Sequence, residues 1–324
     1  KYFFGNISWR GNTKYPDSVL ASILNIKKGE IYNREILYNK LGKTQTAEGG
    51  DISGLYQDDG YLFFNVDPIE TAVYNDTIDF EIRMREGPQA TIKTIRIAGN
   101  EKTKDFVIRR EIRTIPGDKF SRTLLIRSQR EISQLNYFDQ EKIKIDPIPN
   151  PEDGTVDINY GVEEKSSDQL ELSAGWGGFI GLTGTLGVTF NNFSSKNIFN
   201  KSAWDPLPMG DGQKVSLRLQ ASTYFRTYSA SFSEPWFGGK KPVQFSTSLS
   251  FSQQYLNNFV TYQVDKSKSF SILTLSIGVA KRLTVPDDYF VLSQALSYQH
   301  YALNNYNTGL FTFGNGTSRN LSYT

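Results

Sequence analysis

In the second half of this chain, apolar side chains alternate with small uncharged polar ones over long stretches. In Val243–Ser252, the odd positions hold Val, Phe, Thr, Leu and Phe, whereas the even positions hold Gln and four Ser. Successive side chains of a β-strand point to opposite faces, so this alternation predicts strands with one apolar and one polar face. Strands of about ten residues with these two faces are typical of transmembrane β-sheets. Similar segments are Gln169–Trp176, Leu182–Phe190, Val215–Ala221, Tyr228–Ser233, Leu273–Val279 and, less regularly, Phe290–Tyr301.

Charged side chains are distributed unequally between the two halves. Residues 1–167 hold 24 Lys+Arg and 26 Asp+Glu, about 30% of positions, whereas residues 168–324 hold 12 and 8, about 13%. Soluble domains contain about 25% charged residues. The first half therefore resembles a soluble protein, and the second half is predicted to be an antiparallel transmembrane β-barrel. A soluble β-sandwich is the alternative, but its polar face would be expected to carry Lys and Glu where this sequence has Ser, Thr and Gln.

The composition leaves little room for enzyme chemistry. The 324 residues include no Cys and a single His, His300, and the formal net charge is +2. The absence of Cys excludes thiolate nucleophiles, Cys-ligated metals and disulfides, and one His argues against a Ser-His-Asp triad or a His-rich metal site. The balanced charge argues against nucleic acid as a partner. We therefore expect no enzymatic activity, no catalytic residues, no cofactor and no metal.

The first half contains two copies of one sequence unit. Ile7–Asn12 is echoed 88 positions later by Ile95–Asn100, and Thr77–Phe80 is matched by Thr155–Ile158. Each copy shows an alternating strand, two helical stretches and two further strands, which predicts an α+β module of the order βααββ. The open edge of such a small sheet can accept an extended peptide, although two spacer modules without a client are the alternative. The expected domains are 1–88 and 89–167 for the two modules and 168–324 for the barrel part.

Aromatic residues gather near the ends of the predicted strands. In transmembrane barrels such residues form girdles at the two membrane interfaces. The sequence holds about seven strands and the start of an eighth at Leu321–Thr324, after a Gly- and Asn-rich loop at Asn304–Asn320. So few strands with an apolar exterior cannot close, so we expect a truncated barrel or one completed by another segment. The girdle candidates are Trp176, Phe190, Tyr224, Trp236, Phe237 and Tyr289.

Tandem modules that lead directly into a barrel resemble the POTRA repeats and barrel of the BamA-like outer-membrane assembly family. Arg109–Phe120 is similar to the family's "RRE…PGD.F" segment, and Gly154–Lys165 is similar to the link into its first barrel strand. Phe232–Phe237 is similar to its "S.PWF" strand end. The family's "RGF" motif, which lies late in its barrel, is absent from this sequence, as expected of a truncated barrel.

The resemblance implies an insertase, which folds other β-barrel proteins into the outer membrane without covalent chemistry or ATP. Its first barrel strand would be a lateral gate, a poorly sealed edge at which a client strand pairs by β-augmentation. Glycines in and after this strand weaken its packing, although they equally suit a tight first hairpin. These glycines are Gly175, Gly177, Gly178, Gly181, Gly184 and Gly187. The gate strand comprises Gln169, Leu170, Glu171, Leu172, Ser173, Ala174, Gly175 and Trp176.

The same resemblance implies partners and a location. The partners would be unfolded outer-membrane protein clients, accessory outer-membrane lipoproteins of an assembly complex, and the lipid bilayer. The location would be the bacterial outer membrane, with the POTRA modules in the periplasm. A transporter of the two-partner secretion type, which passes a polypeptide through its lumen, is the alternative function, and an adhesive surface protein is a third.

Overall fold

The computed structural model describes residues 1–44, 50–177, 181–204, 207–258, 263–287 and 289–324. These residues form two compact units. Unit 1 comprises Lys1–Glu101 and Ile108–Lys165, and unit 2 comprises Lys102–Val107 and Ser166–Thr324. None of the helices in the described ranges is both long and apolar enough to cross a membrane.

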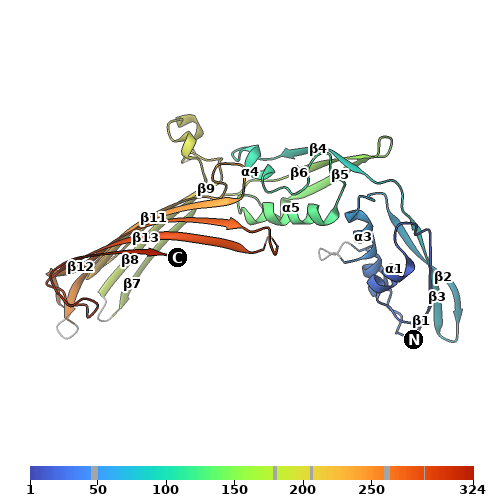
Figure 1. The fold of residues 1–324 in the computed structure, drawn as a ribbon, viewed down its shortest axis with the longest axis horizontal. Helices are drawn as coiled ribbons and strands as arrows, with labels where there is room; N and C mark the ends of the chain where they lie inside the picture. Colours follow the sequence, from blue (N-terminus) through green and yellow to red (C-terminus); the bar gives the residue numbers. More distant parts are fainter. Residues whose placement is uncertain (45–49, 178–180, 205–206, 259–262, 288) are drawn as a thin grey trace. The chain divides into compact units, whose positions relative to one another are not determined.

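The first module of unit 1 is a three-stranded sheet packed against short helices (Figure 1). Its sheet order is β1-β3-β2, with β3 parallel to β1 and antiparallel to β2. Ile78, Phe80, Ile82 and Met84 alternate along β3 and are buried in a core shared with the helices. The elements are β1 (Phe3–Arg10), α1 (Asp17–Leu24), α2 (Arg34–Leu41), α3 (Ile52–Asp58), β2 (Asn65–Tyr74) and β3 (Thr77–Arg85).

The second module repeats this arrangement and confirms the predicted α+β modules. Its sheet order is β4-β6-β5, and α5 lies along one face of the sheet (Figure 1). The modules differ in the second helical stretch, which the first module splits into α2 and α3 because Gly42 (φ +81°) ends α2 and Asp51 caps the start of α3. The boundaries at 88/89 and 167/168 stay predictions. The elements are β4 (Thr91–Ala98), α4 (Asp105–Arg109), α5 (Arg122–Gln134), a 3₁₀ turn (Gln140–Lys142), β5 (Lys144–Asn150) and β6 (Thr155–Gly161).

The Gly-Asn turn that marks both repeats is explained by a close approach of two backbones. Gly11 and Gly99 have φ angles of +89° and +92°, which L side chains rarely adopt. A Cβ atom at Gly99 would lie 1.8 Å from the carbonyl oxygen of Val162, and one at Gly11 would lie 2.2 Å from that of Met84. Only glycine fits both positions, so the repeated motif ends the first strand of each module.

The two modules of unit 1 are joined by polar contacts between α3 and the start of α5. Asp58 accepts hydrogen bonds from the Ser121 hydroxyl (2.9 Å), the Thr123 N–H (2.7 Å) and the Thr123 hydroxyl (2.6 Å). Asp51, which is buried, forms an ion pair with Arg122 at 3.1 Å. These contacts attach the first turn of α5 to both ends of α3.

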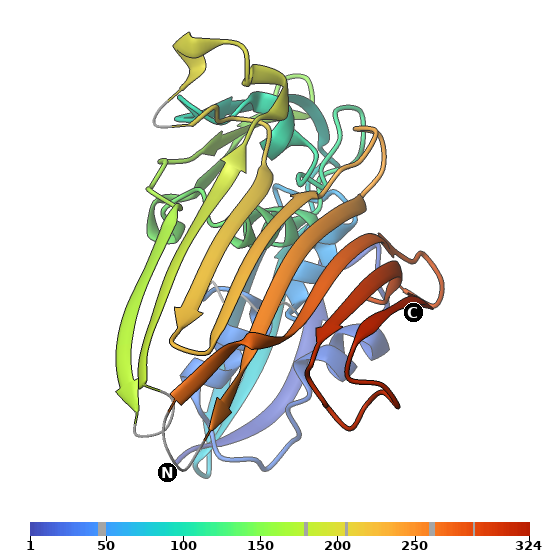
Figure 2. The ribbon, with the colours of Figure 1, turned by 90° about the vertical axis from the view of Figure 1, so that its left-hand side faces the viewer.

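Unit 2 contains one antiparallel sheet of eight strands in the order of the sequence, from β7 to β14 (Figure 2). This confirms the N-terminal part of a barrel. One detail was predicted wrongly: the eighth strand begins at Gly316 rather than Leu321, because Gly316–Thr317 pair with Leu303–Ala302. The strands are β7 (Gln169–Gly177), β8 (Gly181–Phe193), β9 (Gln213–Ser222), β10 (Phe225–Glu234), β11 (Val243–Asn258), β12 (Gln263–Arg282), β13 (Val291–Asn304) and β14 (Gly316–Tyr323).

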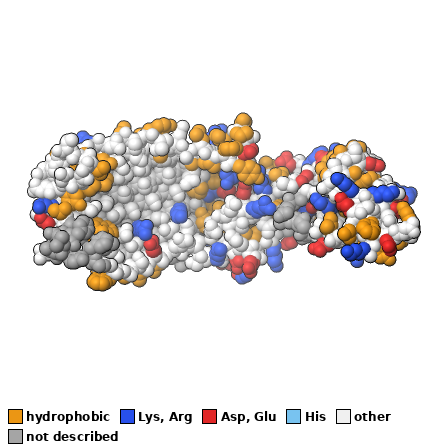
Figure 3. Space-filling model, turned by 90° about the horizontal axis from the view of Figure 1, so that it is seen from below, with side chains coloured by type: hydrophobic (Ala, Val, Ile, Leu, Met, Phe, Trp, Pro, Cys, Tyr) orange, Lys and Arg blue, Asp and Glu red, His pale blue; other side chains and the backbone are white. Residues whose placement is uncertain are grey.

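The register of this sheet separates an apolar face from a polar face with few charged side chains. Figure 3 shows that the side of the sheet in view carries few Lys, Arg, Asp or Glu side chains. Hydroxyls on neighbouring strands bond each other at three places in the described part of the sheet: Thr189 with Ser216 (2.9 Å), Thr227 with Ser252 (3.2 Å) and Ser276 with Ser297 (2.8 Å). One polar row crosses all the strands: Gln169, Thr189, Ser216, Ser231, Ser248, Ser276, Ser297 and Ser322. An apolar row consists of Leu172, Leu186, Leu219, Tyr228, Phe251 and Leu273.

Candidate functional site at the edge of the large sheet

Strand β7 forms one edge of the eight-stranded sheet. It pairs with β8 from Gln169↔Thr189 to Gly177↔Gly181, and no described strand lies on its other side. In an antiparallel sheet, consecutive residues direct their N–H and C=O groups to opposite neighbours. One known hydrogen bond therefore fixes the direction of these groups across the whole sheet.

That hydrogen bond is donated by the Tyr255 N–H of β11 to the Tyr224 carbonyl at the start of β10, at 2.7 Å. Traced through the pairings of β10, β9 and β8, it assigns the odd-numbered residues of β7 to bonds with β8. The reciprocal bonds between Ala295 and Thr324 (3.0 and 2.9 Å) give the same assignment from the opposite end of the sheet. The free edge of β7 therefore presents the N–H and C=O groups of Leu170, Leu172, Ala174 and Trp176.

The side chains of β7 follow the same alternation. Leu170, Leu172 and Trp176 lie on the apolar face and are 71%, 79% and 78% exposed. The opposite face carries Gln169, Glu171, Ser173 and Gly175, of which Gln169 begins the polar row. The edge strand thus combines an apolar face, a polar face and a row of backbone groups without a strand partner in the described ranges.

Glu171 makes an ion pair that crosses a neighbouring strand. Its Oε1 lies 2.9 Å from Nη2 of Arg218 on β9, and Gly187 of β8 lies between them in the register. A Cβ atom at Gly187 would lie 3.1 Å from Oε2 and 3.2 Å from Cβ of Glu171, and 3.7 Å from Cγ of Arg218. The glycine leaves the space in which the two side chains meet, so the pair ties the edge strand to β9.

The start of β7 is held by the end of β8. The Asn191 N–H donates to the Asp168 carboxylate (3.0 Å), and the Asn191 side chain donates to the Ser167 carbonyl (2.5 Å). The opposite end of β7 has no comparable side-chain anchor in the described part of the chain, apart from a bond from the Thr183 hydroxyl to the Gly175 carbonyl (3.2 Å). The strand is therefore anchored most firmly at its first residues.

A buried polar network surrounds the turn between β8 and β9. The Asn192 side chain donates to Thr103 (2.8 Å) and accepts from the Gly212 N–H (2.9 Å), and all of Thr103, Asn192 and Asp211 are buried. Asp211 forms an ion pair with Lys104 at 2.6 Å. This network fixes the segment that leads into β9 and hence the position of Arg218.

Comparisons with known proteins agree with this architecture. The POTRA family, described as a surface antigen variable number repeat, matches residues 2–87 and 90–165, and the Omp85 superfamily domain matches residues 209–322. The outer membrane protein assembly factor BamA of Neisseria meningitidis is 29% identical over 95% of the chain, and that of Buchnera aphidicola is 24% identical over 94%. The chain belongs to the BamA-like Omp85 family.

Relatives and structures also define how much of an Omp85 protein this chain represents. The chain spans 35% of the length of the Neisseria relative and 44% of the Buchnera one. The crystal structure of BamA from Haemophilus ducreyi lacking POTRA domains 1-3 superposes over the whole chain with a TM-score of 0.69 at 19% identity, and the chain covers 58% of it. This likeness shows the fold. As an Omp85 member, the chain is an outer-membrane protein whose POTRA modules lie in the periplasm.

The girdle candidates of this Omp85 sheet fall at both ends of its strands. Trp176 is the next-to-last residue of β7 and Tyr224 lies in the turn between β9 and β10, at one end of the sheet. Phe190 near the end of β8, Trp236 and Phe237 between β10 and β11, and Tyr289 before β13 lie at the other end. Phe237 and Tyr289 are largely exposed. Their role at a membrane interface stays a prediction, as does the role of the gate strand.

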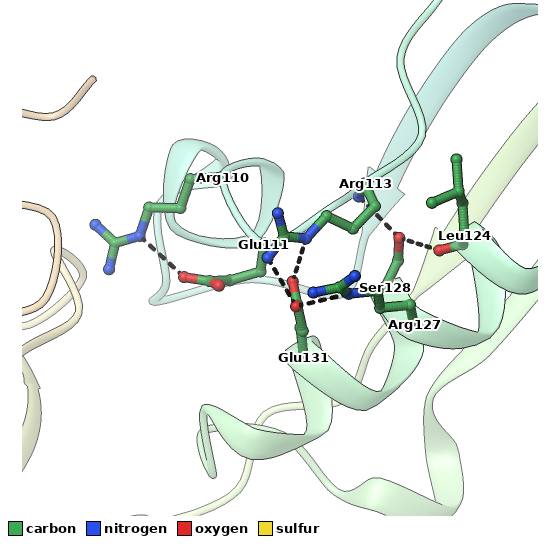
Figure 4. Close-up of polar contacts among 7 residues, drawn as sticks. All are labelled: Arg110, Glu111, Arg113, Leu124, Arg127, Ser128 and Glu131. Carbon is green, nitrogen blue, oxygen red and sulfur yellow. Dashed lines mark hydrogen bonds and ion pairs between the residues drawn. The ribbon is translucent and has the colours of Figure 1, made fainter. Parts of the chain in front are cut away.

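The family-like segment Arg109–Phe120 is attached to α5 by polar contacts. Arg113 bonds Glu131 of α5 through two guanidinium nitrogens at 2.7 and 2.8 Å, and Arg127 approaches the same carboxylate at 3.4 Å (Figure 4). The Arg113 N–H also donates to the buried Ser128 hydroxyl at 2.9 Å. Glu131 is buried, so its pair with Arg113 holds the segment onto α5, whereas Arg127 pairs with Glu131 within the same helix.

Two other residues of the site, Arg218 and Asn192, were not predicted from the sequence, and Gly187 was predicted only as a glycine that weakens the packing of the gate strand. Arg218 and Gly187 meet Glu171 only because of the strand register, and nothing near them in the sequence marks a pair. Asn192 has a positive φ of 58°. Its role could have been suspected from the Asn191-Asn192 pair and the later Gly210-Asp211-Gly212 segment, because Asn and Gly favour turns. Of the predicted gate glycines, Gly178 lies outside the described residues.

Proposed function

We propose that this chain is part of a BamA-like assembly factor that inserts other β-barrel proteins into the outer membrane, with β7 as its lateral gate. The observation that carries the proposal is the free edge of β7, at which Leu170, Leu172, Ala174 and Trp176 direct backbone groups away from β8. In hydrocarbon, each backbone group without a hydrogen bond costs several kcal/mol. Such an edge therefore favours pairing with a further strand, either one of the same barrel or one of an incoming client.

The side chains of β7 suit the same role. An incoming strand would extend the apolar face that Leu170 and Leu172 begin and the polar face on which Glu171 lies. The new strand would gain hydrogen bonds at alternate residues, as in β-augmentation. Strand pairing at β7 needs no covalent chemistry, cofactor or nucleotide, so the proposed function is not enzymatic.

The partners of the proposed function are unfolded outer-membrane protein clients, accessory outer-membrane lipoproteins and the lipid bilayer. The POTRA modules would receive clients by strand addition before these reach the barrel. Support for this step comes from the names of the relatives, which are outer membrane protein assembly factors, and from β2, the outer strand of the first module, which has no strand on its other side in the described ranges.

Proline substitution at chosen positions of β7 tests the gate in the full-length protein. Leu172→Pro removes an N–H that points to the free edge and leaves every N–H that bonds β8 in place. Leu172→Ala is the matched control, because it shortens the same side chain and keeps the N–H. Ser173→Pro removes an N–H that bonds β8 and should disturb the protein's own sheet.

We expect Leu172→Pro to lower the rate of client assembly at least about tenfold, while the protein itself stays folded and membrane-inserted and Leu172→Ala assembles clients normally. Client assembly is measured as the folded fraction of a newly synthesised barrel protein in proteoliposomes. Normal assembly by Leu172→Pro would refute the gate. Normal assembly together with a client-dependent conductance through the lumen would favour the secretion-type transporter instead.

A further inference from the structure

The outermost strands of the two POTRA modules, β2 and β5, occupy equivalent places. Each pairs with the central strand of its sheet, and within the described ranges neither has a strand on its other side. Their sequences align as Val66-Asp67-Pro68-Ile69-Glu70 and Ile145-Asp146-Pro147-Ile148-Pro149. The two edges thus differ most sharply at one position, where Glu70 stands in the first module and Pro149 in the second.

The backbone direction of β2 follows from a hydrogen bond on the other side of its sheet. The Phe3 N–H donates to the Asp76 carbonyl at 2.8 Å, so the even-numbered residues of β3 face β1. Pro68 and Glu70 pair with two of these, Ile82 and Phe80. In an antiparallel pair, two residues opposite each other either both bond the partner strand or both point away from it. The backbone groups of Pro68 and Glu70 therefore point to the free edge of β2.

The same reasoning applies to β5. The Thr91 N–H donates to the Gly154 carbonyl (3.0 Å) and the Val162 N–H donates to the Ala98 carbonyl (2.9 Å), so the even-numbered residues of β6 face β4. Pro147 and Pro149 pair with the even-numbered Ile158 and Val156. Both prolines therefore face the free edge of β5, where they remove N–H donors without weakening the module's own sheet.

The two edges consequently offer different rows of donors. The edge of β5 presents residues 145, 147 and 149, of which only Ile145 has an N–H. The edge of β2 keeps the N–H of Val66 and Glu70, and after a bulge between Glu70 and Ala72 that of Val73. Val73 and the adjacent Tyr74 are 57% and 46% exposed, so apolar side chains accompany the donors.

We propose that Pro149 closes the edge of β5 to strand addition, so that of these two modules only the first accepts an added strand, at the outer half of β2, Ile69–Tyr74. The occupant is an extended segment of an unfolded polypeptide with alternating apolar side chains, because only another backbone satisfies a row of N–H and C=O groups and Val73 and Tyr74 offer apolar contact. The inference rests on the proposed function, since it assumes that the protein handles unfolded barrel clients.

Photocrosslinking to the whole chain in detergent micelles tests this proposal. The probe is a synthetic peptide with the sequence of Val243–Ser252, a strand of the kind that clients contain, with a photoreactive group at its centre. Crosslinks are mapped by mass spectrometry to 65–74, 144–150 or 169–177. Two exchanges compare the edges: Glu70→Pro gives β2 the proline of β5, and Pro149→Glu gives β5 the N–H of β2. Glu70→Gln keeps the N–H and removes only the charge, and circular dichroism checks that each variant is folded.

We expect crosslinks at β2 and none above background at β5 in the unmodified chain. Glu70→Pro should reduce the β2 crosslinks at least about fivefold, Glu70→Gln should leave them within about twofold, and Pro149→Glu should create crosslinks at β5. Equal crosslinking of β2 and β5 would overturn the proposal, and so would unchanged β2 crosslinks in a folded Glu70→Pro variant. A loss of β2 crosslinks in Glu70→Gln as large as that in Glu70→Pro would also overturn it. Crosslinks at 169–177 report separately on the gate, so either idea can fail while the other survives.

Discussion

The ion pair between Glu171 and Arg218 helps to hold the edge strand β7 in the sheet. Both side chains are about half exposed, at 51% and 53%. Ion pairs with such exposure contribute about 0.2–1 kcal/mol, because water screens them. Arg218→Gln should therefore raise the equilibrium for opening of β7 by a factor of about 1.4 to 5.

Hydrogen exchange measured by mass spectrometry on residues 169–177 detects this opening. The amides of Glu171 and Ser173 bond β8, so they exchange only when β7 separates from it. Exchange should accelerate equally in Arg218→Gln, in Glu171→Gln and in the double variant, because each removes the same interaction. High salt should bring the unmodified protein closer to the variants.

Gly187→Ala tests the same ion pair through the space that the glycine leaves for it. An added Cβ would crowd Glu171 at 3.1–3.2 Å, whereas alanine otherwise favours a strand over glycine by about 0.5–1 kcal/mol. In the Glu171→Gln background Arg218 no longer holds the side chain by an ion pair, so the side chain can move away from the added Cβ, and Gly187→Ala should slow exchange of β7 more there than in the unmodified protein. The reasoning is refuted if Arg218→Gln leaves the exchange rate unchanged, or if the effects of the Arg218 and Glu171 substitutions simply add.

Three further predictions concern unit 1 and are checked by thermal or acid unfolding followed by circular dichroism. Gly99→Ala should destabilise the second module by about 2–4 kcal/mol, because its Cβ would lie 1.8 Å from a carbonyl oxygen. Gly117→Ala is the control: its φ is +96°, but a Cβ there has open space, so the substitution should cost only about 1 kcal/mol. Equal losses of stability in the two variants would contradict the steric argument. Asp58→Ala should cost about 1–3 kcal/mol, since it removes the acceptor of three hydrogen bonds at the module junction, and an unchanged melting temperature would contradict that role. A hydrogen bond from Lys14 lowers the pKa of Asp59 below its ordinary 3.8. The stability contributed by this carboxylate is therefore present above about pH 4 and is lost as the pH falls through the lowered pKa. Asp59→Asn should lose less stability on acidification than the unmodified protein.

The sequence predicted those features of the fold that depend on local pattern. The alternation in Val243–Ser252 was sufficient to assign a strand and its two faces, because burial on one side imposes a period of two. The repeat of Ile7–Asn12 at Ile95–Asn100 was sufficient to predict two equivalent modules, because Gly11 and Gly99 each serve a backbone contact that only glycine allows. The break between α2 and α3 was not predicted, since it lies in the stretch where the two copies differ in length.

The contacts of the site could not be predicted, because they depend on register. Alternation shows which residues of one strand share a face, but not which residue of the next strand lies opposite. Glu171, Gly187 and Arg218 line up only through the lengths of the loops that connect β7, β8 and β9. The Asp58 junction likewise brings together residues 63 and 65 positions apart.

The direction of the free edge of β7 is a consequence of register over the whole sheet. The bond between Tyr255 and Tyr224 and the bonds between Ala295 and Thr324 lie on different strands, yet both assign the even residues of β7 to the edge. Their agreement requires that no bulge interrupts the paired central parts of the strands. The irregularities between Phe190 and Phe193 and between Tyr255 and Leu256 do lie near strand ends. One inserted residue within β8 or β9 would exchange the odd and even residues of β7. Leu172 would then bond β8, and the edge would present Glu171 and Ser173.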